Sequence, residues 1–183
     1  KLEDTVITHK FASATIQDWA RYYQSVTDVL FFVHPDVADR VIARNALEYS
    51  AKPVAFCSKD TANSRDIFEM VLLLCGGREN FDRVPCLLHY SEPISPLAYY
   101  GPAVDKILYC AKNRIPVINS PAPQAAGTAP ATLAGTVVQG NAETLSGLVL
   151  HQFTNPGAPF VAGAFTTIMD MRTTVFSYGA CEM

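Results

Sequence analysis

Short apolar runs alternate with helical patterns along most of this chain, and this alternation limits the folds that it can adopt. The runs begin near residues 29, 53, 86, 115 and 159, and polar residues rarely interrupt them. Continuous apolar runs indicate strands that are buried on both faces, as in parallel sheets covered by helices. The pattern therefore predicts βα units with parallel strands.

Helical periodicity fills the intervals between these runs. Pro102 either kinks the helix expected around it or marks its true start, because proline cannot donate a backbone hydrogen bond. Thr128 can cap the last helix, and Pro130 suits its first turn. The expected helices are residues 12–26, 35–49, 64–77, 96–113 and 130–154.

Five strands separated by helices fit a doubly wound sheet or part of a (β/α)8 barrel. A complete barrel needs about 250 residues, whereas the chain has 183, begins without methionine and stops just after a turn-like segment. We therefore expect residues 1–183 to form a single partial (β/α)8 TIM-type barrel domain of about five βα units, truncated at both ends.

Composition excludes several classes of function. The net charge is −3 and no cluster of Lys and Arg occurs, which argues against a nucleic-acid surface. No signal peptide and no membrane-spanning apolar run is present, so we expect a cytoplasmic protein without membrane contact. The five scattered cysteines are typical of reduced, buried thiols, and no metal-ligand spacing or glycine-rich phosphate loop occurs.

The segment 119–130 is rich in proline, alanine and glycine, like a linker between domains. However, it follows a strand and precedes a helix, so it is better explained as a βα loop. Ligands bind at the carboxyl ends of the strands in both candidate architectures. The segment is then part of a binding face. The alternative is a packed irregular loop without a ligand.

The other strand ends supply further candidates for this face. His89 is either a polar wall of a pocket, with a possible role in proton transfer, or a structural histidine. Arg172 either binds a carboxylate through its planar guanidinium or forms a salt bridge to Asp170. The candidate substrate-binding residues are His89, Tyr90, Glu92, Asn119, Phe165, Asp170, Arg172 and Tyr178.

Two further features of this face carry alternatives. Tyr90, Phe165, Phe176 and Tyr178 could form an aromatic cage for a quaternary ammonium group, although aromatic residues are more often part of a core. The segment 139–143 lies inside the last helix, where Glu143 is either solvated or bonded within the barrel wall. Gln139 and Asn141 are doubtful site residues.

Three long motifs near the C-terminal end resemble the MttB-type methyltransferases, the trimethylamine:corrinoid methyltransferase family, which includes members that act on glycine betaine. They are G-T-A-P-A-T-L-A-G at 127–135, N-A-E-x-L-x-G at 141–147 and N-P-G-A-P at 155–159, followed by M-D-M-R-T and S-Y-G-A-C-E. The resemblance is most specific over residues 115–182 and extends from about residue 28.

The resemblance implies a (β/α)8 barrel within a longer chain. It also implies that a methyl group moves from a methylated amine to the Co(I) centre of a partner corrinoid protein, as in methylotrophy and methanogenesis. The corrinoid cofactor belongs to that partner, and the loop residues expected to face it are Gln124, Ala126, Gly127 and Thr128. A homo-oligomer is expected, no metal site is expected on this chain, and no catalytic residue is assigned.

The substrate depends on the role of Arg172. If this residue faces the barrel interior, a substrate with a carboxylate, such as glycine betaine, is favoured. The alternatives are a trimethylamine enzyme that uses pyrrolysine, whose position would lie beyond Met183, and a non-catalytic ligand-binding barrel.

Overall fold

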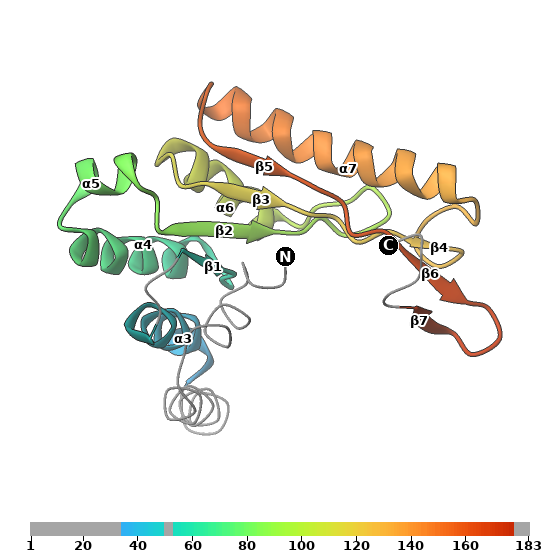
Figure 1. The fold of residues 1–183 in the computed structure, drawn as a ribbon, viewed down its shortest axis with the longest axis horizontal. Coiled ribbons are helices and arrows are strands. Elements are labelled where there is room, and N and C mark those ends of the chain that lie inside the picture. The colour runs from blue at the N-terminus through green and yellow to red at the C-terminus, as the bar shows by residue number, and fades with distance from the viewer. Residues whose placement is uncertain (1–33, 50–52, 178–183) are drawn as a thin grey trace. The chain divides into compact units, whose positions relative to one another are not determined.

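The computed structural model describes residues 34–49 and 53–177 (Figure 1). The chain divides into two compact units, Lys1–His89 and Tyr90–Met183. The helix expected at 12–26 and the strand expected near residue 29 lie outside the described residues.

The first unit contains the first described strand, the start of the second and the helices that precede and separate them. Helix α3 (Pro35–Tyr49) coincides with its predicted range, and strand β1 (Val54–Phe56) follows. Helices α4 (Thr61–Cys75) and α5 (Arg78–Arg83) then lead to β2 (Leu87–Ser91). Strand β1 runs parallel to β2, with Val54 opposite Leu87. This parallel βα arrangement confirms the prediction from the apolar runs.

The ends of α4 differ from the predicted range of 64–77. The Asp60 carboxylate accepts a hydrogen bond of 2.8 Å from the backbone N–H of Asn63, so the helix starts at Thr61. Gly76 adopts a left-handed conformation with φ of 74° and ends the helix. Glycine is preferred there because it lacks a Cβ atom. The short α5 was not predicted.

The core of the first unit is formed by side chains of α4, α5 and the two strands. Phe68 and Phe81 meet edge to face with their ring centroids 5.1 Å apart. The other fully buried apolar side chains of this core include Val54, Ile67, Val71 and Leu87. The expectation that the cysteines are buried is confirmed for Cys110 and wrong for Cys57, which is exposed, while Cys75 and Cys86 are half-buried.

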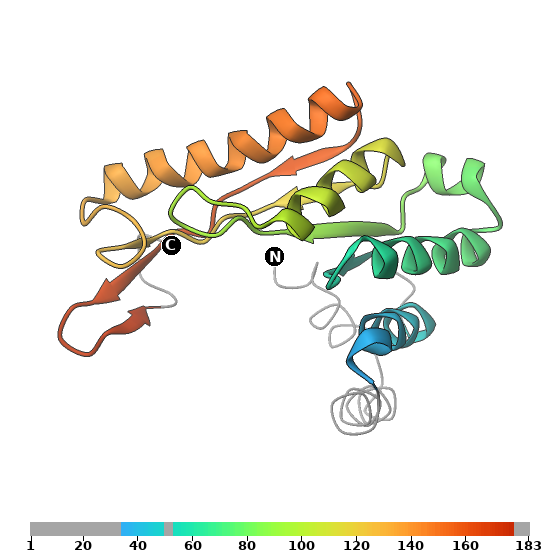
Figure 2. The same ribbon diagram turned by 180° about the vertical axis from the view of Figure 1, so that it is seen from behind.

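The second unit continues the βα pattern. Helix α6 (Gly101–Lys112) leads to β3 (Val117–Asn119), and α7 (Leu133–Thr154) leads to β5 (Phe160–Ala162). Strands β3 and β5 are parallel, and the Ser120 N–H donates a 3.0 Å hydrogen bond to the carbonyl of Ser91 at the end of β2. Figure 2 shows α6 and α7, which pack against each other.

Two helix starts in this unit differ from prediction. Helix α6 begins at Gly101 with Pro102 in its first turn, so this proline marks the true start and does not kink the helix. The cap of α7 is Thr132, whose hydroxyl accepts a 3.2 Å hydrogen bond from the Gly135 N–H, and not Thr128. The Thr128 hydroxyl instead accepts a hydrogen bond from Gln124 within the preceding loop.

A second, small sheet in this unit was not predicted. Strand β4 (Gln124–Ala125) pairs in parallel with β6 (Thr167–Asp170), which forms an antiparallel hairpin with β7 (Val175–Ser177). Each of these strands contains polar residues, such as Gln124, Thr167 and Ser177, so no continuous apolar run marks them in the sequence.

Parallel pairing of the strands is confirmed within residues 34–49 and 53–177. The described strands do not close into a ring, and the complete barrel therefore stays a prediction. Within the same residues, no helix combines the length and the apolar character needed to cross a bilayer.

Candidate functional site

An open hollow lies where β2 and β3 end in the second unit. Its volume is about 380 Å³, and it is enclosed by two loops, the β2–α6 loop (residues 92–100) and the β3–α7 loop (residues 120–132), which we call the mouth loops. The carboxyl ends of parallel strands are the usual place for ligands in α/β folds. The lining residues are Glu92, Pro93, Ile94, Ser95, Ala122, Gln124 and Thr128.

Glu92 places an exposed carboxylate at this hollow. The hydroxyl of Tyr90, which belongs to β2, donates a 3.2 Å hydrogen bond to Glu92 Oε2. This hydrogen bond restrains the carboxylate. Both residues were predicted from the end of the strand, and the structure brings them together. An exposed carboxylate at the edge of a hollow favours a cationic ligand.

Gln124 and Thr128 join in a tight turn within the β3–α7 loop. The Gln124 N–H donates to the Thr128 hydroxyl at 3.1 Å, and the Gln124 carbonyl accepts from the Thr128 N–H at 3.0 Å. Ala126 has a left-handed backbone with φ of 65°. A Cβ atom at Gly127 would lie 2.6 Å from Met169 Cε, the flexible end of a side chain of β6, so this turn packs closely on β6. The four residues predicted to face the corrinoid therefore form one turn.

Asn119 ends β3 but is fully buried, and its side chain ties β3 to α7. Its amide donates to the Glu143 carbonyl at 3.3 Å, and its Oδ1 accepts from the Tyr99 hydroxyl at 3.2 Å. Asn119 does not line the hollow.

Glu143 and Gln139 carry contacts to both mouth loops that sequence reasoning missed. The Glu143 side chain is 2% exposed, so the solvated alternative is wrong and the bonded one is confirmed. Its carboxylate accepts hydrogen bonds from Ser95, Leu97 and Gln139. The sequence offered one indication of this pair, because Gln139 and Glu143 are four residues apart and residues at that spacing lie on the same face of a helix.

His89 belongs to the first unit and lies inside it. Its side chain is fully buried, and its ring centroid is 5.1 Å from that of Phe56 on β1. This packing favours the structural interpretation of this histidine.

Asp170 and Arg172 lie at the turn between β6 and β7. Asp170 accepts from the backbone N–H of Arg172 at 2.8 Å and from the Thr173 hydroxyl at 2.9 Å. These hydrogen bonds, with the Arg172 N–H first, hold the pKa of Asp170 below its ordinary value. The predicted salt bridge is not formed, because the contact comes from the Arg172 backbone while its exposed side chain forms no ion pair with described residues.

The aromatic candidates are only partly described. The Phe165 and Phe176 side chains are exposed, and Tyr178 lies outside the described residues. Over the described part of the chain, no group of three or more His, Cys, Asp or Glu side chains is close enough to hold a metal ion.

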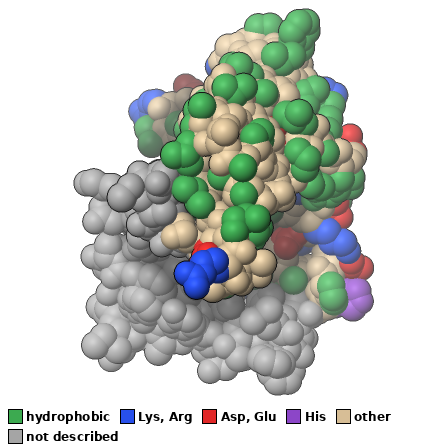
Figure 3. All heavy atoms as spheres, turned by 90° about the vertical axis from the view of Figure 1, so that its right-hand side faces the viewer, with side chains coloured by type: hydrophobic (Ala, Val, Ile, Leu, Met, Phe, Trp, Pro, Cys, Tyr) green, Lys and Arg blue, Asp and Glu red, His purple; other side chains and the backbone are tan. Residues whose placement is uncertain are grey.

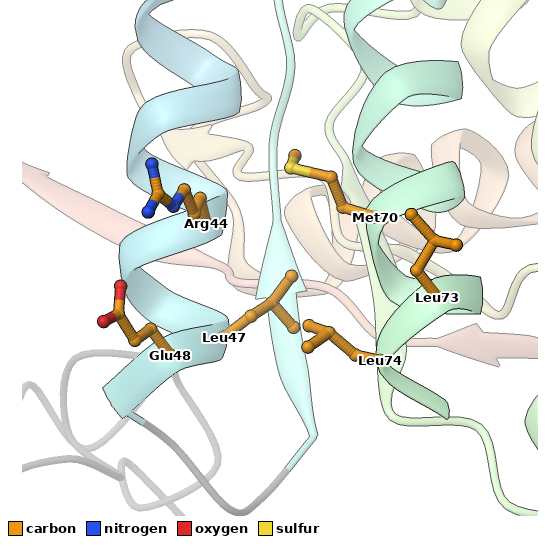
Figure 4. A pocket seen from close by; sticks show the side chains of 6 residues that line it. All are labelled: Arg44, Leu47, Glu48, Met70, Leu73 and Leu74. Atoms are coloured by element: carbon orange, nitrogen blue, oxygen red, sulfur yellow. The ribbon is translucent and has the colours of Figure 1, made fainter. Parts of the chain in front are cut away.

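A second hollow, of about 360 Å³, lies in the first unit between α3 and α4 (Figure 4). Leu47, Met70 and Leu74 project into it, and Arg44 and Glu48 lie on the α3 side. It is mainly apolar and is formed by helix side chains, away from the strand ends, so it lacks the features of a catalytic site.

Comparison with known proteins identifies the family. The model of the trimethylamine methyltransferase family matches residues 33–183, and the chain therefore belongs to this family. This confirms the resemblance noted from the three motifs.

Three relatives show the range of names within the family. A trimethylamine methyltransferase of Desulfitobacterium hafniense is 32% identical over 82% of this chain and 30% of its own length. A glycine betaine methyltransferase of the same species is 31% identical over 80% of this chain and 32% of its own length. A proline betaine:corrinoid methyltransferase of Eubacterium limosum is 40% identical over 54% of this chain and 20% of its own length. The chain thus spans about a third or less of the length of these relatives.

Proposed function

We propose that the protein containing this chain transfers a methyl group from a methylated amine to the Co(I) of a partner corrinoid protein. The observation that carries the proposal is a hollow with a carboxylate, Glu92, at the strand ends of a chain that belongs to the trimethylamine methyltransferase family. The name of the Eubacterium limosum relative, a proline betaine:corrinoid methyltransferase, supports a corrinoid acceptor.

The chemistry needs no proton transfer if the substrate is a quaternary amine. The electron pair of Co(I) forms the bond to the methyl carbon, and the electron pair of the C–N bond remains on nitrogen as the neutral tertiary amine leaves. The protein has to bind the cation, orient one methyl group towards cobalt and exclude water. Glu92 supplies a carboxylate suited to binding the cation, and the Tyr90 hydroxyl holds that carboxylate in place.

Docking of the corrinoid protein fits the small residues of the β3–α7 loop. Ala126 is partly exposed and Gly127 is exposed, so a broad, flat corrin ring could approach the turn that they form. Gln124 and Thr128 of the same turn line the hollow, which would place the acceptor beside the bound amine. A closed barrel, cytoplasmic location and assembly into a homo-oligomer belong to the same proposal.

Glycine betaine is the substrate that we favour. Its ammonium group suits Glu92, and its carboxylate suits the Arg172 guanidinium, which no described residue neutralises. Two relatives are named for betaines. Trimethylamine is the second candidate, because the Desulfitobacterium relative matched over 82% of this chain is named for it.

The test mixes the full-length protein with a corrinoid protein reduced to Co(I) and follows the cobalt absorption spectrum. Glycine betaine and trimethylamine are added separately. We expect methylation of cobalt with glycine betaine, and a loss of roughly tenfold to a hundredfold in kcat/KM in Arg172→Gln, because the substrate carboxylate would lose the guanidinium that binds it.

The control variant is Arg83→Gln, which removes an exposed arginine of α5 in the first unit. Equal activity of both variants with glycine betaine would remove Arg172 from the site. Methylation with trimethylamine alone would replace the betaine proposal by the second candidate. Absence of methylation with either amine would contradict methyl transfer from these substrates and favour a non-catalytic ligand-binding barrel.

A further inference from the structure

We propose that Glu143 and Gln139 are positioning residues that hold both mouth loops in the arrangement that receives a methylated ammonium group. The identity of the ligand rests on the proposed function. The holding of the loops does not, because it follows from hydrogen bonds within the second unit.

Glu143 holds the β2–α6 loop at two points. Its Oε2 atom accepts a 2.7 Å hydrogen bond from the Ser95 hydroxyl, and its Oε1 atom accepts a 2.9 Å hydrogen bond from the Leu97 N–H. Ser95 also lines the hollow. One side chain of α7 therefore fixes the loop that carries Glu92.

Gln139 extends this link to the β3–α7 loop. Its amide nitrogen donates to Glu143 Oε1 at 2.9 Å and to the Thr128 carbonyl at 2.9 Å. Thr128 lines the same hollow as Ser95 of the β2–α6 loop. A continuous chain of hydrogen bonds thus runs from Ser95 through Glu143 and Gln139 to Thr128, and both central residues stand on one helix.

The charge of Glu143 fits the same role. A buried carboxylate is costly unless donors surround it, and Ser95, Leu97 and Gln139 provide three. Among the described residues, no ion pair includes Glu143. Its negative charge therefore lies one hydroxyl group behind the hollow without a cationic partner, which favours a cation in the hollow.

The first experiment measures the loops without any substrate. Hydrogen exchange is followed by mass spectrometry in the full-length protein and in the variants Glu143→Ala, Glu143→Gln and Gln139→Ala. We expect exchange to accelerate roughly tenfold or more in residues 92–100 and 122–130 of Glu143→Ala. In Gln139→Ala the change should be concentrated in residues 122–130.

Glu143→Gln should exchange like the unaltered protein. The glutamine oxygen can accept from Leu97 and Gln139, and its amide can donate to the Ser95 hydroxyl, so all three links survive. The matched control is Gln152→Ala, because Gln152 also stands on α7 but donates to the Ala158 carbonyl at 2.9 Å, at the other end of the helix. This control should leave residues 92–100 and 122–130 unchanged.

The second experiment measures methyl transfer per folded protein. We expect kcat/KM to fall roughly tenfold to a hundredfold in Glu143→Ala, since small displacements of binding groups have effects of this size. Glu143→Gln should restore kcat, and the lost charge should appear as a higher KM. This split between kcat and KM distinguishes positioning from a general loss of stability.

Three results would overturn the proposal. The first is unchanged exchange in both loops of Gln139→Ala, which removes one hydrogen-bonding side chain and can be tested even if Glu143→Ala does not fold. The second is faster exchange throughout the chain, including α4, which would show a general structural role. The third is equal loss of activity in Glu143→Gln and Glu143→Ala. If the unaltered protein transfers no methyl group while the loops respond as expected, only the proposed function fails.

Discussion

His151 lies buried near the C-terminal end of α7, against strand β5. Its ring centroid is 5.2 Å from that of Phe160, and its Nδ1 atom lies 3.1 Å from the Gln152 amide nitrogen. Burial lowers the pKa of His151 from its ordinary value, because the charged ring would lose its hydration. The folded protein therefore keeps this ring neutral at a pH where the unfolded chain binds a proton.

The pH dependence of stability follows from this difference. As the pH falls below about 6.5, the unfolded chain binds a proton that the folded protein excludes, so the free energy of unfolding decreases by up to about 1.4 kcal/mol per pH unit. When the pH is lowered from about 7 to about 5, we expect the free energy of unfolding of full-length His151→Gln to decrease less than that of the unaltered protein.

Urea denaturation at several pH values provides the measurement. His34→Gln is the control, because His34 is exposed. An unchanged slope of stability against pH in His151→Gln would contradict the prediction.

At the scale of an element, α7 comes close to β3 because small residues line its inner face. Gly140 and Gly147 lie two turns apart and are both buried. A Cβ atom at Gly147 would lie 2.9 Å from the Tyr99 hydroxyl oxygen and closer still to the Asn119 amide. The glycine therefore permits the contacts that tie α7 to the end of β3.

We expect Gly147→Ala to lower the free energy of unfolding by about 1 kcal/mol. Overpacking costs about 1–3 kcal/mol, and the better helix propensity of alanine offsets about 1 kcal/mol. Urea denaturation of the full-length protein measures the effect.

Gly101→Ala serves as the control, since nothing lies within 4 Å of the position of its added Cβ atom. This control should leave stability unchanged or raise it slightly. Equal midpoints for the two variants would show that α7 can move away from β3 at no cost.

At the scale of the whole molecule, the outer surface of α7 and the edge of β5 are incompletely covered by residues 34–49 and 53–177. The exposed fractions of Val138 and Phe153 on α7 are 69% and 86%, and that of Val161 on β5 is 48%. Figure 3 shows hydrophobic side chains spread over the described part of the face that includes the N-terminal end of α7. Apolar surface and an unpaired strand edge of this kind favour association with further protein.

We propose that further chain covers this edge in the full-length protein, since this chain spans only 30% of the Desulfitobacterium trimethylamine methyltransferase. Backbone amides of β5 should exchange at least about tenfold more slowly in the full-length protein than in the isolated 183-residue chain.

The amides of β3, which pairs with β5, provide the internal control and should be protected in both samples. Equal exchange of β5 in the two samples would show that this edge stays uncovered.

The sequence alone was sufficient for the order of the main elements and for the family. The runs at β1, β2 and β3 could be located because burial of a strand leaves a local pattern of apolar residues. The run at β5 has the same apolar pattern, although Val161 and Ala162 are exposed among the described residues. The range of α3 was also correct, and the three motifs identified the family. Tyr90 and Glu92 could be predicted as site residues in a similar way, because they lie at the end of a strand that the apolar run locates.

Only the tertiary structure decided which distant residues meet. Glu143 lies 48 residues from Ser95, and no local pattern specifies that the carboxylate of one helix will hold a loop so far along the chain. The pairing of β4 with β6 and the packing of Gly127 on Met169 are contacts of the same kind. Local periodicity records whether a residue is buried, whereas its hydrogen-bond partner depends on where the other segments come to lie.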